Sequence, residues 1–169
     1  MAERYEPEKL VWTEADFDTM GWHDVTIHAV AFFPERFEFG LDLDYIFRWV
    51  DPEDEGGCCT FWVAAATMVF ENAYDIVFEV DTSAGLEVAH ISRADPKPPH
   101  DAKAAGRDTE WTWTIQCQEG AIRLRSVGYK MFVRTAPVLQ GGQTLDPEIR
   151  GGISFARSQA SGPDSPNED

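Results

Sequence analysis

The chain has 169 residues, and its 30 Asp and Glu against 14 Lys and Arg give a formal net charge of −16. This length corresponds to one domain with a single core, and the 43% of hydrophobic and 12% of aromatic residues exclude a disordered chain. A surface this acidic repels phosphate groups, so neither nucleic acids nor anionic membranes are expected as partners.

The cysteines and the N-terminus indicate the cellular compartment. The three cysteines, Cys58, Cys59 and Cys117, are odd in number and fit no zinc-binding spacing. They predict reduced thiols, as in cytosolic proteins. The N-terminal residues are charged, unlike a signal peptide, and no apolar run approaches the roughly 20 residues of a membrane helix. We therefore expect a cytoplasmic protein that does not bind membranes.

One short helix is predicted near the N-terminus, within residues 13–21. Thr13 and Asp16 have the spacing of a capping box, in which the two residues satisfy each other's backbone N–H groups. Gly21 is a typical residue just after a helix end. The helix is therefore expected over Glu14–Met20.

The clearest pattern in the chain is a strict alternation from Phe37 to Trp49, where every odd residue is large and apolar. This period of two predicts a strand with one buried and one solvent-exposed face, the latter including Asp42 and Asp44. The preceding stretch Trp22–Ala31 alternates as well, and residues 33–36 resemble a turn. The two stretches predict an antiparallel hairpin.

The rest of the chain favours strands over helices. The expected fold is mainly β, an antiparallel sheet curled into a sandwich or a partial barrel, with one globular domain over residues 1–157. Residues 94–109 read as a long loop and residues 158–169 as a disordered tail. The further predicted strands are Phe61–Phe70 (the most central), Tyr74–Val80, Leu86–Ile91, Glu110–Cys117 and Ile122–Val133, the last two forming a second hairpin.

Charge is distributed unevenly along the chain. Residues 1–55 contain 15 acidic and 4 basic residues, whereas residues 120–157 contain 2 acidic and 6 basic residues. Two interpretations remain open. The fold could bring its own acidic and basic segments together, or the acidic surface could bind a charged partner.

The densest group of polar residues lies on the predicted hairpin. Pairing odd residues with odd residues would place Asp24 opposite Asp44 and Thr26 opposite Asp42, with His28 diagonal to Asp42. His23 would point toward the core. Three carboxylates and one imidazole would then share the exposed face.

This group of Asp24, His28, Asp42 and Asp44 permits several interpretations. Carboxylates and imidazole could bind manganese, iron or zinc, and two carboxylates could act as an acid–base pair in hydrolysis. Alternatively, the group is a structural polar network whose repulsion is relieved by solvent or by arginines such as Arg123 and Arg125. The chain has no phosphate-binding glycine loop, dinucleotide motif or nucleophile elbow, so neither a cofactor nor a catalytic residue is predicted.

The segment Met20–His28, which contains Trp22-His23-Asp24, resembles the start of small bacterial toxin-immunity domains, where a long alternating strand follows. Residues 14–155 also resemble a bacterial domain family of unknown function. The segments that carry this second resemblance are Trp22–Asp24, Asp42–Phe47, Phe61–Val63 and Arg150–Phe155. The immunity resemblance implies binding of a toxin protein, and a strongly acidic protein would suit a basic toxin.

These observations favour a non-enzymatic, partner-binding β-domain whose partner is a basic protein. The alternative is a protein that binds a metal or small ligand, or a hydrolase, acting through the face with Asp24, His28, Asp42 and Asp44. The residues expected at the surface of the partner-binding domain are Asp42, Asp44, Asp51, Glu53, Asp54 and Glu55.

Overall fold

The computed structural model describes residues 3–159, so the predicted disordered tail lies outside the described residues from Ala160 onward. Within this range the protein is mainly β, with antiparallel strands and few helical turns. The strands are β1 (Val11–Thr13), β2 (Thr26–Phe33), β3 (Glu38–Val50), β4 (Thr60–Glu71), β5 (Tyr74–Val80), β6 (Leu86–Lys97), β7 (Glu110–Cys117), β8 (Gly120–Ser126), β9 (Gly128–Val133) and β10 (Val138–Gln140).

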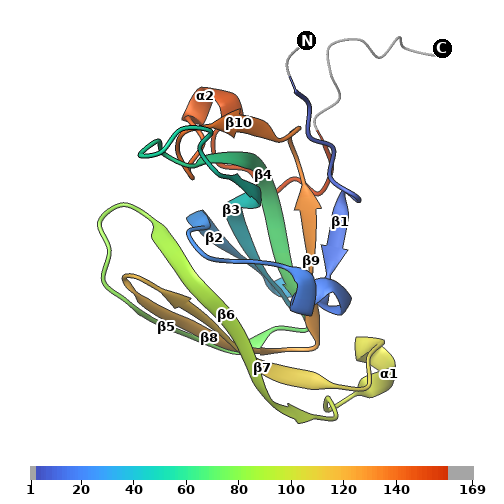
Figure 1. Cartoon of the computed structure of the whole chain (residues 1–169). Helices are drawn as coiled ribbons and strands as arrows, with labels where there is room; N and C mark the ends of the chain where they lie inside the picture. The colour runs from blue at the N-terminus through green and yellow to red at the C-terminus, as the bar shows by residue number, and fades with distance from the viewer. Residues whose placement is uncertain (1–2, 160–169) are drawn as a thin grey trace, which may run out of the picture.

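The strands form two layers that face each other, as in a sandwich (Figure 1). One layer has the order β1-β9-β4-β3-β2, and the other has the order β6-β7-β8-β5. A short pairing of Thr26 and Ile27 on β2 with Glu87 and Leu86 on β6 joins the layers at one edge, so the sheet curls over without closing into a barrel. The predicted fold class is therefore confirmed.

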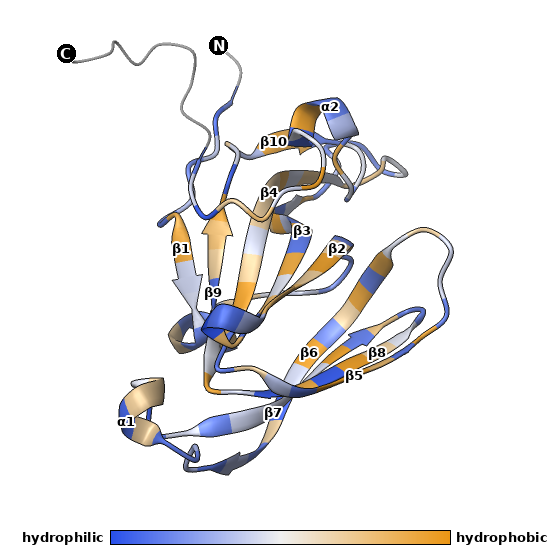
Figure 2. Cartoon of the chain, turned by 180° about the vertical axis from the view of Figure 1, so that it is seen from behind, coloured by the Kyte–Doolittle hydropathy of each residue, from blue (hydrophilic) through white to orange (hydrophobic). Residues whose placement is uncertain are grey.

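The main core lies between the two layers. It includes the odd residues Phe39, Leu41 and Leu43 of β3, as the alternation predicted, together with Trp113 and Ile115 of β7. β4 lies between β3 and β9 and is buried on both faces, which agrees with its continuous apolar sequence. In Figure 2, β4 is pale or hydrophobic along much of its length, whereas β3 has hydrophilic positions between the hydrophobic ones.

The β2–β3 hairpin is present, but its predicted register is wrong. Thr26, not Asp24, lies opposite Asp44, and Ala29 lies opposite Asp42. One cause is the turn, which is centred between Glu35 and Arg36 rather than at Pro34, because Phe33 pairs with Glu38. The other is a β-bulge at His28, which inserts one extra residue into β2 and reverses the side chains on its two sides relative to each other. Val30 and Phe32 therefore lie opposite the core residues Leu41 and Phe39, although they are even-numbered.

Three other predicted elements change in detail. The N-terminal helix is a 3-10 helix over Glu14–Thr19 that begins with the predicted capping box of Thr13 and Asp16. The predicted strand 122–133 is two strands, β8 and β9, which belong to different layers. β6 continues to Lys97, so the predicted loop 94–109 contributes its first four residues to this strand. The same predicted loop also contains α1 (Ala102–Ala105).

The chain after β9 covers the outer face of the first layer (Figure 1). We refer to residues 138–157 as the C-terminal segment. It contains β10, which pairs with β4, and α2 (Pro147–Arg150). Leu145 packs on Ile46, Val63 and Ala65 in a second, smaller core. The outer face of β3 is therefore enclosed by protein, which positions the residues described next.

Candidate functional site

Asp42 of β3 lies at the centre of a buried ionic network beneath the C-terminal segment. Its side chain is fully buried, and Arg150 of α2 donates to both of its oxygens, at 2.6 Å to Oδ1 and 3.0 Å to Oδ2. Arg134 donates to Oδ1 at 2.9 Å, and the backbone N–H of Ser154 donates to Oδ2 at 3.0 Å. Two arginines that follow β9 therefore neutralise a carboxylate about a hundred residues earlier in the chain.

Asp44 belongs to the same network and is also fully buried. Arg150 Nε donates to its Oδ1 at 3.1 Å, and the backbone N–H of Leu145 donates to Oδ2 at 2.9 Å. His28 Nε2 lies 2.7 Å from the same Oδ2, and its side chain is 22% exposed. Arg150 thus bridges both carboxylates, while His28 is the point at which the network reaches the surface.

The pKa values follow from this geometry. Burial alone would raise the pKa of Asp42, but the hydrogen bonds from Arg150, Arg134 and Ser154 outweigh burial and hold its pKa below the usual range. Burial would likewise lower the pKa of Arg150, yet its hydrogen bonds and charge interactions with Asp42 and Asp44 raise it. The carboxylate of Asp42 and the guanidinium of Arg150 are therefore both charged at neutral pH.

The prediction that Asp42 and Asp44 lie on a solvent-exposed face is wrong. Polar and apolar residues alternate along a strand in the same way whether arginines or water cover its polar face. The structure also corrects the identity of the arginines. Arg134 and Arg150 relieve the repulsion, whereas Arg123 pairs with Glu79 and Arg125 with Glu110.

Asp24 lies apart from Asp42 and Asp44, at the edge where the two layers join. It adopts a left-handed backbone conformation (φ 66°), and its carboxylate accepts a hydrogen bond from Gln143 Nε2 at 2.6 Å. His23 Nδ1 lies 2.9 Å from the other oxygen, and its side chain is 67% exposed rather than directed into the core as predicted. The four residues of the predicted hairpin site are thus divided between two places.

A group of acidic side chains surrounds Asp24. Burial and the nearby charges of Asp24 and Glu119 raise the pKa of Glu87. Glu119 accepts hydrogen bonds from the backbone N–H of Glu87 at 3.0 and 3.2 Å. Like charges are therefore concentrated next to the short β2–β6 pairing.

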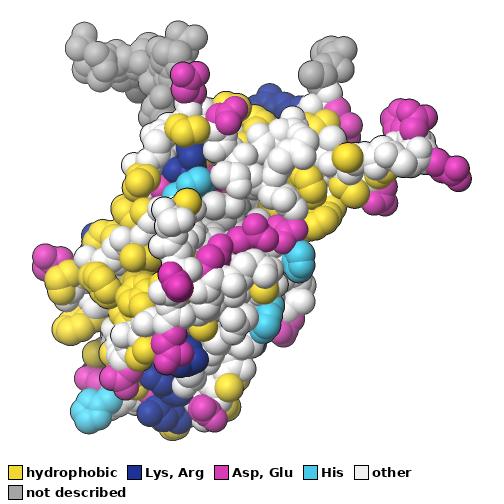
Figure 3. All heavy atoms as spheres, turned by 90° about the vertical axis from the view of Figure 1, so that its left-hand side faces the viewer, with side chains coloured by type: hydrophobic (Ala, Val, Ile, Leu, Met, Phe, Trp, Pro, Cys, Tyr) yellow, Lys and Arg dark blue, Asp and Glu magenta, His cyan; other side chains and the backbone are white. Residues whose placement is uncertain are grey.

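The loop between β3 and β4 contains the remaining predicted residues, and we refer to residues 51–55 as the acidic loop. Asp51, Glu53, Asp54 and Glu55 are all exposed, as predicted. None of them forms an ion pair with another residue in the described range 3–159. Figure 3 shows one face of the molecule on which acidic side chains are spread widely and basic ones are few.

Arg134 and Arg150 are the network residues that sequence reasoning missed. The excess of six basic over two acidic residues in 120–157, against the acidic excess in 1–55, was the available signal. The interpretation that acidic and basic segments pair within the fold holds for Asp42 and Asp44. The charges of the acidic loop stay unpaired among the described residues.

Comparison with known proteins gives no further assignment, because no protein-family model, curated protein or solved structure matches the chain significantly. Within residues 3–159, no helix is long and apolar enough to span a membrane.

Proposed function

We propose that the protein is a non-enzymatic binding domain whose acidic loop recognises a basic protein partner. The observation that supports this proposal is the contrast between two sets of carboxylates. Asp42 and Asp44 are neutralised inside the fold, whereas the four carboxylates of the acidic loop are exposed and have no cationic partner among the described residues. Exposed charge of one sign accelerates association with a partner of opposite charge and selects against partners of like charge.

The alternative of a metal-binding protein or hydrolase has less support from the arrangement of the same residues. The four oxygens of Asp42 and Asp44 already accept hydrogen bonds from arginine, histidine or backbone N–H groups. No group of three or more His, Cys, Asp or Glu residues in the described part of the chain has a geometry suited to a metal ion. We therefore do not favour that alternative.

The specific form of the proposal is an immunity-like protein that neutralises a basic toxin. This form rests on the resemblance of the Trp22-His23-Asp24 segment to immunity domains and on the net charge of −16. A complex of this kind requires no catalytic group on the acidic protein, because complementary charge and surface contact provide both the rate and the specificity of binding.

Calorimetric titration with a ten-residue oligolysine peptide tests the proposal. The test variant replaces the four carboxylates of the acidic loop by amides (D51N, E53Q, D54N, E55Q). The control variant removes the same charge from four exposed positions elsewhere (E35Q, D81N, D108N, E148Q). We expect the loop variant to bind much more weakly than the control variant. Equal binding by the two variants would contradict the proposal, because only the total charge would then matter.

A further inference from the structure

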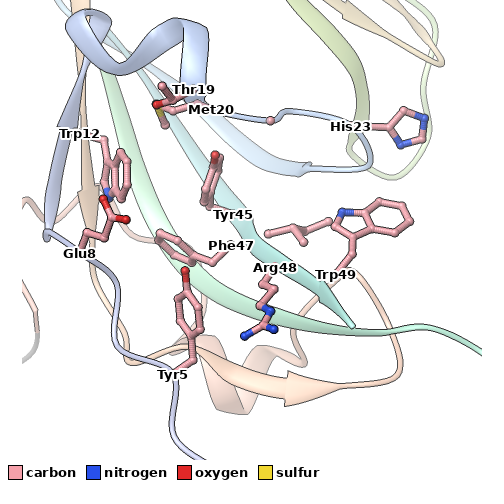
Figure 4. Close-up of a pocket in the computed structure, with 12 residues that line it drawn as sticks. Tyr5, Glu8, Trp12, Thr19, Met20, His23, Tyr45, Phe47, Arg48 and Trp49 are labelled. Atoms are coloured by element: carbon pink, nitrogen blue, oxygen red, sulfur yellow. The ribbon is translucent and has the colours of Figure 1, made fainter. Parts of the chain in front are cut away.

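A pocket of about 300 Å³ lies at the end of β3 from which the acidic loop begins. Its walls come from the N-terminal residues before and after β1 and from the last residues of β3 (Figure 4). The lining is rich in aromatic residues, which are Tyr5, Trp12, Tyr45, Phe47 and Trp49. We refer to this site as the aromatic pocket.

Each aromatic ring of the pocket packs against at least one other aromatic ring. Phe47 lies at the centre, with ring centroids 4.9 Å from Tyr45, 5.9 Å from Tyr5 and 6.3 Å from Trp12. Trp49 packs edge-on against Phe61 at 4.9 Å, yet it remains 47% exposed. Ring packing of this kind fixes the walls of the pocket before anything binds, which lowers the entropic cost of binding.

The pocket also contains a carboxylate. Glu8 is exposed, forms no ion pair with another described residue and lines the pocket together with Trp12 (Figure 4). Burial raises the pKa of the Tyr45 hydroxyl to about 12, so Tyr45 is neutral at physiological pH. The basic residues of the lining are Arg48 and His23; the guanidinium of Arg48 is directed away from Glu8 and Trp12, and His23 lies at the opposite end of the pocket from these two residues (Figure 4).

Aromatic faces and a carboxylate are the groups that bind an organic cation, through cation–π attraction and an ion pair. The chain already uses one of these rings in this way, because the ammonium of Lys9 lies 4.9 Å from the centroid of the Trp12 ring. Lys9 is not among the residues that line the pocket. A volume of about 300 Å³ is at the small end for ligand sites, which suits one side chain better than a large ligand.

We infer that the aromatic pocket is the anchor subsite for a lysine or arginine side chain of the basic partner, with the acidic loop binding further basic residues of the same segment. This inference rests on the proposed function, because it identifies where one residue of the partner is held. Trp49 lines the pocket and lies two residues before Asp51, so the subsite is continuous with the acidic loop.

The experiment combines calorimetry with NMR and uses the ten-residue oligolysine peptide on the full chain. Glu8→Gln and Trp49→Leu should each weaken binding about 2–5-fold, as expected for an exposed ion pair and an exposed cation–π contact. Glu6→Gln is the matched control, because it removes the same charge two residues away from Glu8 without altering the pocket lining, and it should leave the affinity unchanged. In the labelled protein, the indole N–H signals of Trp12 and Trp49 should shift, whereas that of the fully buried Trp113 should not.

The outcomes separate this inference from the proposed function. If amidation of the acidic loop weakens binding but Glu8→Gln and Trp49→Leu do not, the anchor subsite is wrong and the proposed function stands. If neither the loop variant nor the pocket variants weaken binding relative to their controls, both are wrong. If Glu6→Gln weakens binding as much as Glu8→Gln, the effect is one of general charge, and the anchor subsite is contradicted.

Discussion

At the scale of single residues, Arg150 connects parts of the chain that are far apart in sequence. Its guanidinium donates to Asp42, 108 residues earlier, and to Asp44, and it is 5% exposed. A buried ion pair of this kind adds little to stability compared with a well-packed apolar pair, but removing one partner leaves an uncompensated charge inside the protein.

We predict that Arg150→Met lowers the free energy of unfolding by about 3–5 kcal/mol, because it leaves Asp42 with Arg134 alone and the buried carboxylate of Asp44 with no arginine. The matched variant Arg123→Met breaks the exposed ion pair with Glu79 and should cost less than about 1 kcal/mol. Urea unfolding of the two variants measures the difference. Equal, small losses would show that the network does not hold the C-terminal segment on the sheet.

Removing the charge of Glu87 should increase the stability of the protein, in contrast to removing the charge of Arg150. Its pKa is raised in the folded protein by burial and by the charges of Asp24 and Glu119, so the folded state binds its proton more tightly than the unfolded state. Ionisation of Glu87 therefore costs stability as the pH rises above the ordinary pKa of about 4.3.

Glu87→Gln is accordingly expected to raise the melting temperature at pH 7, with a gain that disappears below about pH 4, where Glu87 is protonated in both states. Glu35→Gln provides the control, since Glu35 is exposed and forms no ion pair within residues 3–159. A gain of the same size in Glu35→Gln would attribute the effect to net charge, and a loss of stability in Glu87→Gln would contradict the prediction.

At the scale of the elements, the strands could be predicted where the signal is local. Tyr74–Val80 and Glu110–Cys117 have the predicted bounds because their side-chain pattern and flanking turns are set by neighbouring residues. The bulge at His28 could not be predicted, because one extra residue leaves no mark on composition yet reverses the face of every later residue in β2.

The candidate site was predicted in part for a similar reason. The acidic loop is exposed, as its run of acidic residues indicated. The burial of Asp42 and Asp44 depends on the C-terminal segment, and the pairing of Arg150 with these residues spans more than a hundred positions. A period of two identifies the polar face of a strand, but it does not indicate whether water or an arginine covers that face.

The turn between β7 and β8 provides a test at this scale. Gly120 has φ 137°, and a Cβ at this position would lie 2.0 Å from the backbone carbonyl oxygen of Glu79 on the adjacent strand β5. Gly120→Ala should therefore destabilise the protein by at least about 1–3 kcal/mol, because both the backbone conformation and the β5–β8 pairing must change.

Gly141→Ala is the matched control, since a Cβ there would meet no atom within 4 Å and its φ is not in the left-handed range. It should be close to neutral. Thermal unfolding followed by circular dichroism compares the two variants. A Gly120→Ala protein as stable as Gly141→Ala would show that β5 is not held against the start of β8 in solution.

At the scale of the whole molecule, only part of the acidic charge is neutralised by basic residues within the fold. The arginines of the C-terminal half neutralise Asp42, Asp44 and Glu38, whereas the total of 30 acidic residues leaves a net charge of −16. Such a surplus opposes self-association and favours a partner of opposite charge. The acidic loop and the adjacent aromatic pocket place exposed negative charge next to exposed aromatic side chains.

The measurement that tests the central claim most directly is the salt dependence of oligolysine binding, compared between the wild type and the variant with an amidated acidic loop. Charges within reach of the peptide lose their attraction as salt shortens the screening length from about 30 Å at 0.01 M to about 8 Å at 0.15 M. We predict that the affinity of the wild type falls steeply over this range, whereas that of the loop variant is weak at low salt and changes little. Parallel curves for the two proteins would contradict the account, because the acidic loop would then contribute nothing beyond its share of the total charge.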